Sequence, residues 1–270
     1  MASNLSSIGF SFDTAEEFQQ TMLRLAPECV ERLGCAAGDY SIWRSRTGAE
    51  IWFHLDLLGI EDNAQDIAGL TPFYEGLSLI DIEVIARVIR PDDNAFEGAF
   101  TAQVMDPDGT NEGFPMTFEA VDFAAHADRE LPFRAQLKLT GFARQVRAFA
   151  DEAAYAADRS GPMGEIQLSP QAFIPVGQFA DPDEGAAEEG PPAPTALLTG
   201  RVSEHRTQVN EATGRPYHWL LVDSLAASID IVADPECITG EIVQGGTVEI
   251  GCVLIGRMIE SPADAVSYDA

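Results

Sequence analysis

Lysine, cysteine and long apolar runs are scarce in this 270-residue sequence, and each scarcity excludes a class of protein. The only lysine, Lys138, follows a leucine, so the phosphate-binding loop G-x-x-x-x-G-K-[ST] cannot form. Four cysteines are too few for a disulfide scaffold. No apolar run approaches the roughly 18 residues of a membrane-spanning helix. The opening segment MASNLSSIGFSF lacks the basic and apolar parts of a secretory signal, so we expect a cytoplasmic protein that does not engage membranes.

Basic side chains are scarce as well, because 16 Lys and Arg residues face 44 Asp and Glu residues, a net charge of −28. No segment is a basic island, so the electrostatic footprint of a nucleic-acid-binding protein is absent. An acidic surface repels phosphate backbones and attracts basic proteins. The alternative is that the charge serves solubility alone. The hydrophobic content of 46% suffices for a folded core, so the charge does not indicate disorder.

Periodicity predicts a mainly β N-terminal domain over residues 1–179. Apolar residues recur at helical spacing near 14–33 and 144–158, and Thr14 with Glu17 forms a capping box at the start of the first helix. Between these helices the period is two, which predicts strands near 51–55, 80–88, 96–104, 114–120 and 133–139. Short turns rather than helices join these strands, so we expect an antiparallel β-rich domain with short flanking helices.

A second, smaller domain is predicted to follow an acidic, proline-rich linker at 180–194. Strand patterns then occur at 197–209, 216–223, 229–233 and 248–258, and the first two are expected to form a hairpin around 210–214. Several twisted strands in so short a segment, with glycines where a strand must bend, predict a small OB- or SH3-like β-barrel over 195–262. Residues 263–270 are assigned to a tail.

The densest group of arginine, histidine and aromatic side chains lies in this second domain. The candidate binding residues are Arg201, His205, Arg206, Arg215, Tyr217 and Trp219. If the hairpin forms, Tyr217 and Trp219 share one face and His218 lies on the other. Single-stranded nucleic acid stacks on such combinations of aromatic rings and arginines. The alternative is that the two rings fill the core while the arginines pair with Glu204 and Glu211.

No catalytic residue and no metal ligand is predicted. Asp81 and Glu83 share a strand face roughly 6–7 Å apart, the separation used in paired-carboxylate hydrolysis, but a solvated face is the simpler interpretation. The acidic segment 106–112 lacks the closing glutamate of an EF-hand and is interpreted as a turn. His54 is expected to be hydrogen-bonded on its strand, and His126 to be exposed. The cysteines are expected to be buried free thiols.

The leading functional hypothesis is a non-enzymatic, acidic interaction protein without a cofactor. It would engage another protein, a basic one, in an inhibitor, immunity or scaffold role through its acidic surface or an exposed sheet edge. The first alternative is a single-stranded nucleic-acid-binding OB-like module at 195–260. The second is a hydrolase that uses paired carboxylates.

Overall fold

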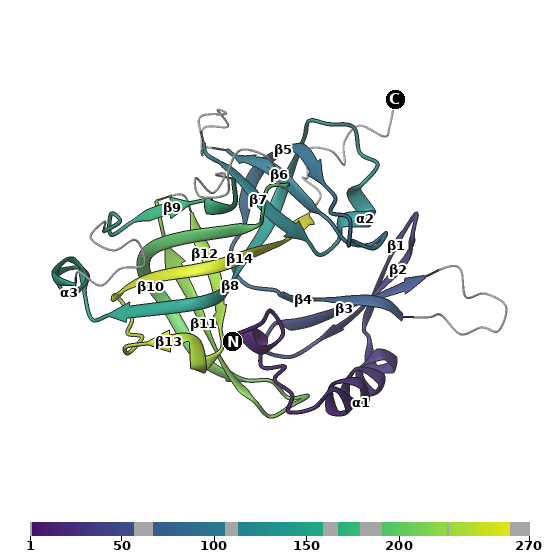
Figure 1. The fold of residues 1–270 in the computed structure, drawn as a ribbon, viewed down its shortest axis with the longest axis horizontal. Helices are drawn as coiled ribbons and strands as arrows, with labels where there is room; N and C mark the ends of the chain where they lie inside the picture. The colour runs from purple at the N-terminus through teal and green to yellow at the C-terminus, as the bar shows by residue number, and fades with distance from the viewer. Residues whose placement is uncertain are drawn as a thin grey trace.

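Two β-sheets make up most of the protein, as Figure 1 shows. The computed structural model describes residues 2–56, 67–105, 113–158, 167–178, 191–225 and 227–259. The smaller sheet is antiparallel with its strands in chain order: β1 (Glu31–Cys35), β2 (Gly38–Arg44), β3 (Ala49–Asp56) and β4 (Ile67–Tyr74). The predicted mainly β class is therefore confirmed.

The larger sheet holds ten strands of mixed direction. They are β5 (Ile80–Val88), β6 (Ala99–Val104), β7 (Pro115–Ala120), β8 (Phe133–Phe149), β9 (Ala172–Ile174), β10 (Thr195–Val209), β11 (Pro216–Asp223), β12 (Ser228–Ala233), β13 (Ile238–Thr239) and β14 (Thr247–Ile259). Two closed circuits of strand pairing share the antiparallel pair β8–β14. One circuit continues through β10, β11 and β12 back to β8, and the other through β7, β6 and β5.

The helices are short. They are η1 (Ser6–Ile8), α1 (Ala15–Leu25), η2 (Ala26–Glu28), α2 (Phe123–His126), α3 (Glu152–Ala157), η4 (Val176–Gln178) and η5 (Pro235–Cys237). The capping signal at α1 is confirmed, because Thr14 Oγ1 accepts the Glu17 N–H at 3.1 Å. The predicted helix to residue 33 is wrong, since β1 begins at Glu31. Pro27 cannot donate within a helix, and the Val30 N–H beyond it donates to Ile42 of β2.

The predicted helix at 144–158 is also wrong over its first half, where β8 continues to Phe149. Gln145 pairs with Gly251 and Ala143 with Cys252, so Arg144 is the extra residue of a β-bulge. The bulge shifts the alternation by one residue, and the next buried side chain after Ala143 is Val146. Such a three-residue step imitates helical spacing. Only α3, capped by the side chain of Asp151, is helical here.

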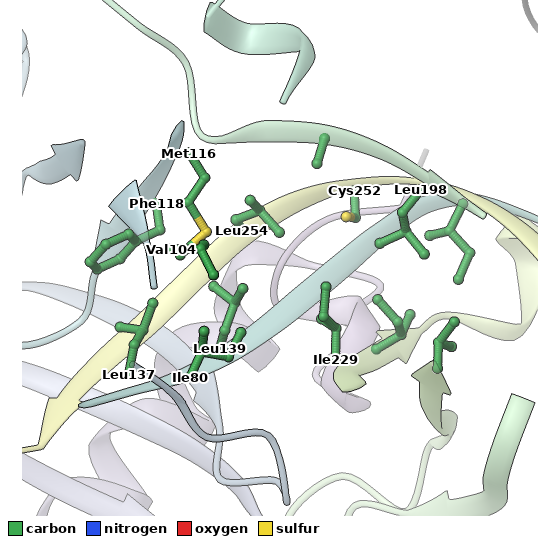
Figure 2. Packing of buried hydrophobic residues seen from close by; sticks show 14 of the residues in the cluster. Ile80, Val104, Met116, Phe118, Leu137, Leu139, Leu198, Ile229, Cys252 and Leu254 are labelled. Atoms are coloured by element: carbon green, nitrogen blue, oxygen red, sulfur yellow. The ribbon is translucent and has the colours of Figure 1, made fainter. Parts of the chain in front are cut away.

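The strands of 195–259 do not form a sheet of their own but belong to the ten-stranded sheet, so the predicted self-contained boundary at residue 195 is corrected. β8, from the preceding part of the chain, pairs with both β12 and β14 and completes their circuit. One hydrophobic cluster runs through both circuits, from Ile80 and Leu137 to Leu198 and Ile229 (Figure 2). The physical reason is the length of β8, because its buried side chains from Ala135 to Val146 contribute to this cluster along both circuits. Most of the predicted linker and the whole tail lie outside the described residues.

A second hydrophobic core joins the two sheets. It combines Tyr40, Trp52 and Phe53 of the smaller sheet with Phe142 and Tyr217 of the larger one, all fully buried. Each such side chain contributes roughly 1.5–3 kcal/mol to folding, so this core fixes how the sheets lie against each other. In the parts of the chain that the structure describes, no helix is long and apolar enough to cross a membrane.

Candidate binding groove

A groove of about 520 Å³ lies where the β4–β5 connection meets the β10–β11 hairpin. Six lining residues define what we call the β10 groove: Arg46, Tyr74, Leu77, Arg206, Val209 and Trp219. Leu77 and Val209 expose 61% and 53% of their surface, which is high for large apolar side chains. The groove therefore offers apolar surface beside two guanidinium groups.

The floor of the β10 groove is aromatic. Arg206 of β10 pairs with Trp219 of β11, and its guanidinium lies 5.3 Å from the indole ring, within the range of a cation–π contact. Tyr74 is buried, and its hydroxyl accepts a hydrogen bond from Gln208 Nε2 at 3.3 Å. Burial raises the pKa of Tyr74 to about 12, so this hydroxyl stays protonated at neutral pH.

A buried carboxylate holds the floor and one wall of the groove together. Asp230 of β12, 1% exposed, accepts hydrogen bonds from Trp219 Nε1 at 2.6 Å and from the Ser78 N–H at 2.5 Å. Burial raises the pKa of Asp230, and these donors counteract the rise. Gly76 leaves room for the carboxylate, because a Cβ at this position would lie 2.1 Å from Asp230 Cγ.

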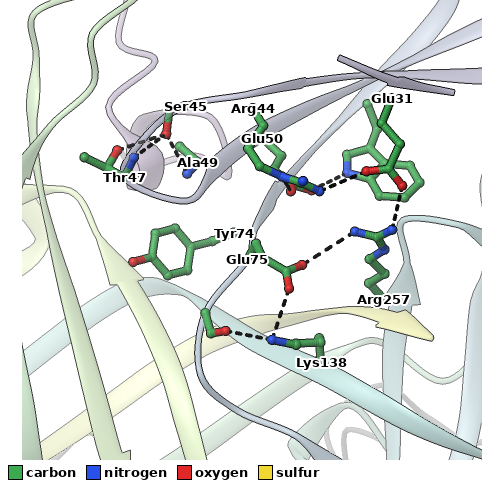
Figure 3. Close-up of polar contacts among 12 residues, drawn as sticks. Glu31, Arg44, Ser45, Thr47, Ala49, Glu50, Tyr74, Glu75, Lys138 and Arg257 are labelled. Atoms are coloured by element: carbon green, nitrogen blue, oxygen red, sulfur yellow. Dashed lines mark hydrogen bonds and ion pairs between the residues drawn. The ribbon is translucent and has the colours of Figure 1, made fainter. Parts of the chain in front are cut away.

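Behind the groove, ion pairs join its wall to the larger sheet, as Figure 3 shows. Lys138 of β8 lies 3.0 Å from a Glu75 carboxylate oxygen and donates to the Gly76 carbonyl at 3.0 Å. Arg257 of β14 approaches the other Glu75 oxygen to 3.6 Å. The only lysine of the sequence therefore positions the segment that carries Leu77.

The same network continues into the smaller sheet. Arg257 pairs with Glu31 at 2.9 Å and lies 5.1 Å from the Trp52 ring. Arg44 pairs with Glu31 and with Glu50, a fully buried acid that also accepts the Trp52 indole N–H at 2.7 Å. Burial raises the pKa of Glu50, and its hydrogen bonds with Trp52 and Arg44 counteract the rise. Breaking a buried pair on one side costs about 3–5 kcal/mol, so this acid depends on its partners.

Two of the six predicted binding residues, Arg206 and Trp219, line the groove. Tyr217 lies beneath it, fully buried, and its hydroxyl donates to Thr47 Oγ1 at 2.9 Å. The predicted pairing of β10 with β11 is confirmed. Alternation along β10 places His205 on the face opposite Arg206. Both aromatic rings belong to the core between the sheets.

The remaining predicted arginines lie elsewhere. Arg215 is 3.3 Å from Asp13 and lines another pocket, beside Phe12 and Asp234. Arg201 is exposed and is paired with Asp223 in the strand register. Of the predicted partners, Glu204 pairs with Arg206 at 3.2 Å. Glu211 accepts the backbone N–H of Arg46 at 2.9 Å and lies 3.9 Å from the Arg46 guanidinium.

Sequence reasoning missed Arg46, Tyr74, Leu77, Val209 and Asp230. One signal in the sequence is the pair of leucines Leu77 and Leu79 just before β5. Large apolar residues in a connection between strands are unusual, and both side chains are exposed. Arg46 lies in the β2–β3 turn, far from β10 in sequence. Only the packing of the two sheets brings it to the groove.

The other candidate sites have simpler interpretations. Asp81 and Glu83 lie beside Gln136 at 3.1 Å and Arg134 at 3.4 Å on the neighbouring strand β8. The acidic segment 106–112 lies outside the described residues. His126 was expected to be exposed, and this is wrong, since its side chain is 12% exposed and lies 3.2 Å from Asp122.

All four cysteines are free, as predicted, although only Cys252 is fully buried. Within the described ranges, no group of three or more histidine, cysteine or acidic side chains is arranged to hold a metal ion. Comparison with known proteins gives no matching family, no matching curated protein and no matching solved structure.

Proposed function

We propose that this chain is a binding protein that engages a protein partner through the β10 groove. The observation that carries the proposal is the exposure of Leu77 and Val209 between Arg46 and Arg206. Protein interfaces combine apolar contacts with arginine in this way. Burial of the exposed half of each apolar side chain would contribute roughly 1–1.5 kcal/mol.

The chemistry of the groove suggests what the partner presents there. A short segment with one apolar side chain and one carboxylate complements the groove, because guanidinium groups form strong hydrogen bonds with carboxylates. The net charge of −28 acts over longer distances and favours a partner that is basic overall. The acidic surface would thus attract basic parts of the partner, while the groove would contact a separate apolar and acidic segment.

In this proposal the circuit of β8, β14, β10, β11 and β12 is a small OB- or SH3-like barrel that displays the groove at one end of its β10–β11 hairpin. Such a rigid support limits the entropy lost on binding. An inhibitor, immunity or scaffold protein would each use a preformed groove of this kind.

Capture from native lysate with the full-length protein, run with and without nuclease, tests the proposal. Leu77→Asp and Arg206→Glu change the groove. Ile89→Asp, at a residue 64% exposed, and Arg201→Glu make the same chemical changes elsewhere. We expect one stoichiometric protein to be retained by wild type and both controls and lost with both groove variants. Calorimetry with that protein should then show a Kd raised at least about tenfold by each groove variant, or about 1.4 kcal/mol.

Equal capture by all five proteins would contradict the groove as the binding surface. A partner that disappears with nuclease would instead favour the single-stranded nucleic-acid hypothesis.

A further inference from the structure

A buried histidine in the smaller sheet has an unused hydrogen-bonding atom. His54 of β3 is fully buried, stacks on Phe96 at 5.2 Å and meets Tyr40 edge-on at 5.5 Å. Among the described residues, no group hydrogen-bonds to its Nδ1. Leaving a buried polar atom unpaired costs about 1–3 kcal/mol, and catalytic use is one recognised reason for such a cost.

A hydroxyl and a carboxylate lie on opposite sides of this imidazole. Thr71 Oγ1 of β4 is 3.2 Å from His54 Nε2, and Glu97 Oε1 is 3.9 Å from His54 Nδ1. Gly69 pairs with His54 across the β3–β4 ladder, and its lack of a side chain leaves space for the Glu97 carboxylate near His54 Nδ1. A Cβ at Gly69 would lie 2.9 Å from Asn94 Nδ2, 3.0 Å from His54 Nδ1 and 3.5 Å from Glu97 Oε1.

Two of the three residues border a pocket of about 260 Å³, and the buried His54 lies outside its lining, behind Thr71. Thr71 and Glu97 line this pocket, and so do Arg90 and Glu119. Arg90 Nη1 lies 3.2 Å from Glu119 Oε1, which places a guanidinium in the same wall. The pocket is separate from the β10 groove, whose lining residues are different.

We propose that Thr71, His54 and Glu97 form a hydrolytic site for small carboxylic esters. The order hydroxyl, imidazole, carboxylate is the arrangement that activates a hydroxyl nucleophile. The pocket volume suits an acyl group of a few carbon atoms. This activity would be additional to partner binding and does not rest on it.

The reaction would proceed in two balanced halves. Thr71 Oγ1 attacks the ester carbonyl carbon while its proton passes to His54 Nε2, and the carbonyl oxygen becomes an oxyanion near the Arg90 guanidinium. The carbon–alkoxy bond then breaks, and the departing alkoxide takes the proton from Nε2, leaving an acyl ester on Thr71. Water repeats the sequence through Nε2, releases the carboxylic acid and restores the threonine.

Glu97 is a positioning residue in this scheme. Burial lowers the pKa of His54 to about 4, so the ring is neutral at neutral pH but a weak base without help from a neighbouring carboxylate. A carboxylate that contacts Nδ1 raises that pKa and stabilises the imidazolium that forms. The Glu97 contact needs to shorten when substrate binds, as catalytic hydrogen bonds often do.

Hydrolysis of p-nitrophenyl acetate by the full-length protein tests the site. Thr71→Val removes the hydroxyl and keeps the shape and the strand preference, while Thr71→Ser keeps a hydroxyl. Thr101→Val is the matched control, because the Thr101 hydroxyl makes a 3.2 Å contact with Thr117 and lies outside the lining of the pocket. We expect Thr71→Val to lose kcat/KM by about 100-fold or more, and the other two variants to retain activity.

Two further measurements identify the residues directly. Acid-quenched mass spectrometry should place an acetyl group on Thr71 of the wild type. Glu97→Gln should lower kcat by about tenfold with KM unchanged, since Glu97 acts through His54. The proposal would be overturned if wild type were no more active than Thr71→Val, if wild type had no activity, or if only another residue were acetylated. The capture experiments at the β10 groove would be unaffected by any of these results.

Discussion

The carboxylate of Asp230 accepts the indole N–H of Trp219 at 2.6 Å. The other oxygen of this carboxylate accepts the Ser78 N–H at 2.5 Å, so one buried acid ties the floor of the β10 groove to its wall. Burial disfavours the charged form of Asp230 and therefore raises its pKa. These two hydrogen bonds connect Asp230 to the floor and to the wall of the groove.

Asp230→Asn should therefore destabilise the protein and loosen the groove. An amide has one acceptor oxygen, so either Trp219 Nε1 or the Ser78 N–H would face a second donor. We expect the free energy of unfolding to fall by about 1–3 kcal/mol, partly offset because no charge is buried. Urea unfolding measures this loss, and tryptophan fluorescence reports the change at Trp219. An unchanged unfolding energy and an unchanged spectrum would show that the two hydrogen bonds are unimportant.

Gly76→Ala should distort the same wall. The new Cβ would lie 2.1–2.4 Å from all three carboxylate atoms of Asp230, and overpacking of this kind costs about 1–3 kcal/mol. Gly251→Ala is the control, because a Cβ at Gly251 meets nothing within 4 Å. The control should be neutral or stabilising by up to about 1 kcal/mol. Thermal unfolding compares the two variants, and equal Tm values would contradict the predicted clash.

Acid should destabilise the fold through His54. Burial lowers the pKa of His54 from 6.5 to about 4 in the folded protein, so the unfolded chain binds the proton more readily. The free energy of unfolding is therefore highest above about pH 6.5. It falls as the pH is lowered towards 4, by up to about 1.4 kcal/mol per pH unit. Unfolding energies of wild type and His54→Gln between pH 7.5 and 4.5 test this. The difference between the two proteins should fall with pH, and parallel curves would contradict the prediction.

The thiols should differ in reactivity. Burial raises the pKa of Cys237 to about 11 and of Cys252 to about 12, and only thiolates react readily with disulfide reagents. At pH 8 the native protein should leave Cys252 unmodified, and after unfolding without reductant all four cysteines should react. Fewer than four reactive thiols in the unfolded protein would reveal a disulfide and contradict the free-thiol structure.

Several strands were predictable because their signal is local. Ile80, Ile82 and Val84 alternate with exposed or half-buried neighbours along β5, and a turn separates β10 from β11 as expected. The capping of α1 by Thr14 could also be predicted from the local sequence. In each case, neighbouring residues carry the whole signal.

Other features were not predictable, for identifiable reasons. The bulge at Arg144 interrupts the alternation of β8 and imitates a helix. The short strand β1 follows Pro27 with a pattern too brief to separate from a helix end. His54 was expected to be satisfied by neighbours on its strand, yet its Nδ1 lacks a hydrogen bond among the described residues.

By itself, the sequence determined the mainly β class, the acidic surface and many strand positions, because side-chain period and charge depend on residues close together in the chain. Tertiary structure alone decided that β8 completes both circuits of strand pairing, and that the two sheets share a core. The β10 groove and the Thr71–His54–Glu97 arrangement follow from those long-range contacts. Strand pairing across such distances depends on which apolar faces can be buried together, and local periodicity carries no information about that choice.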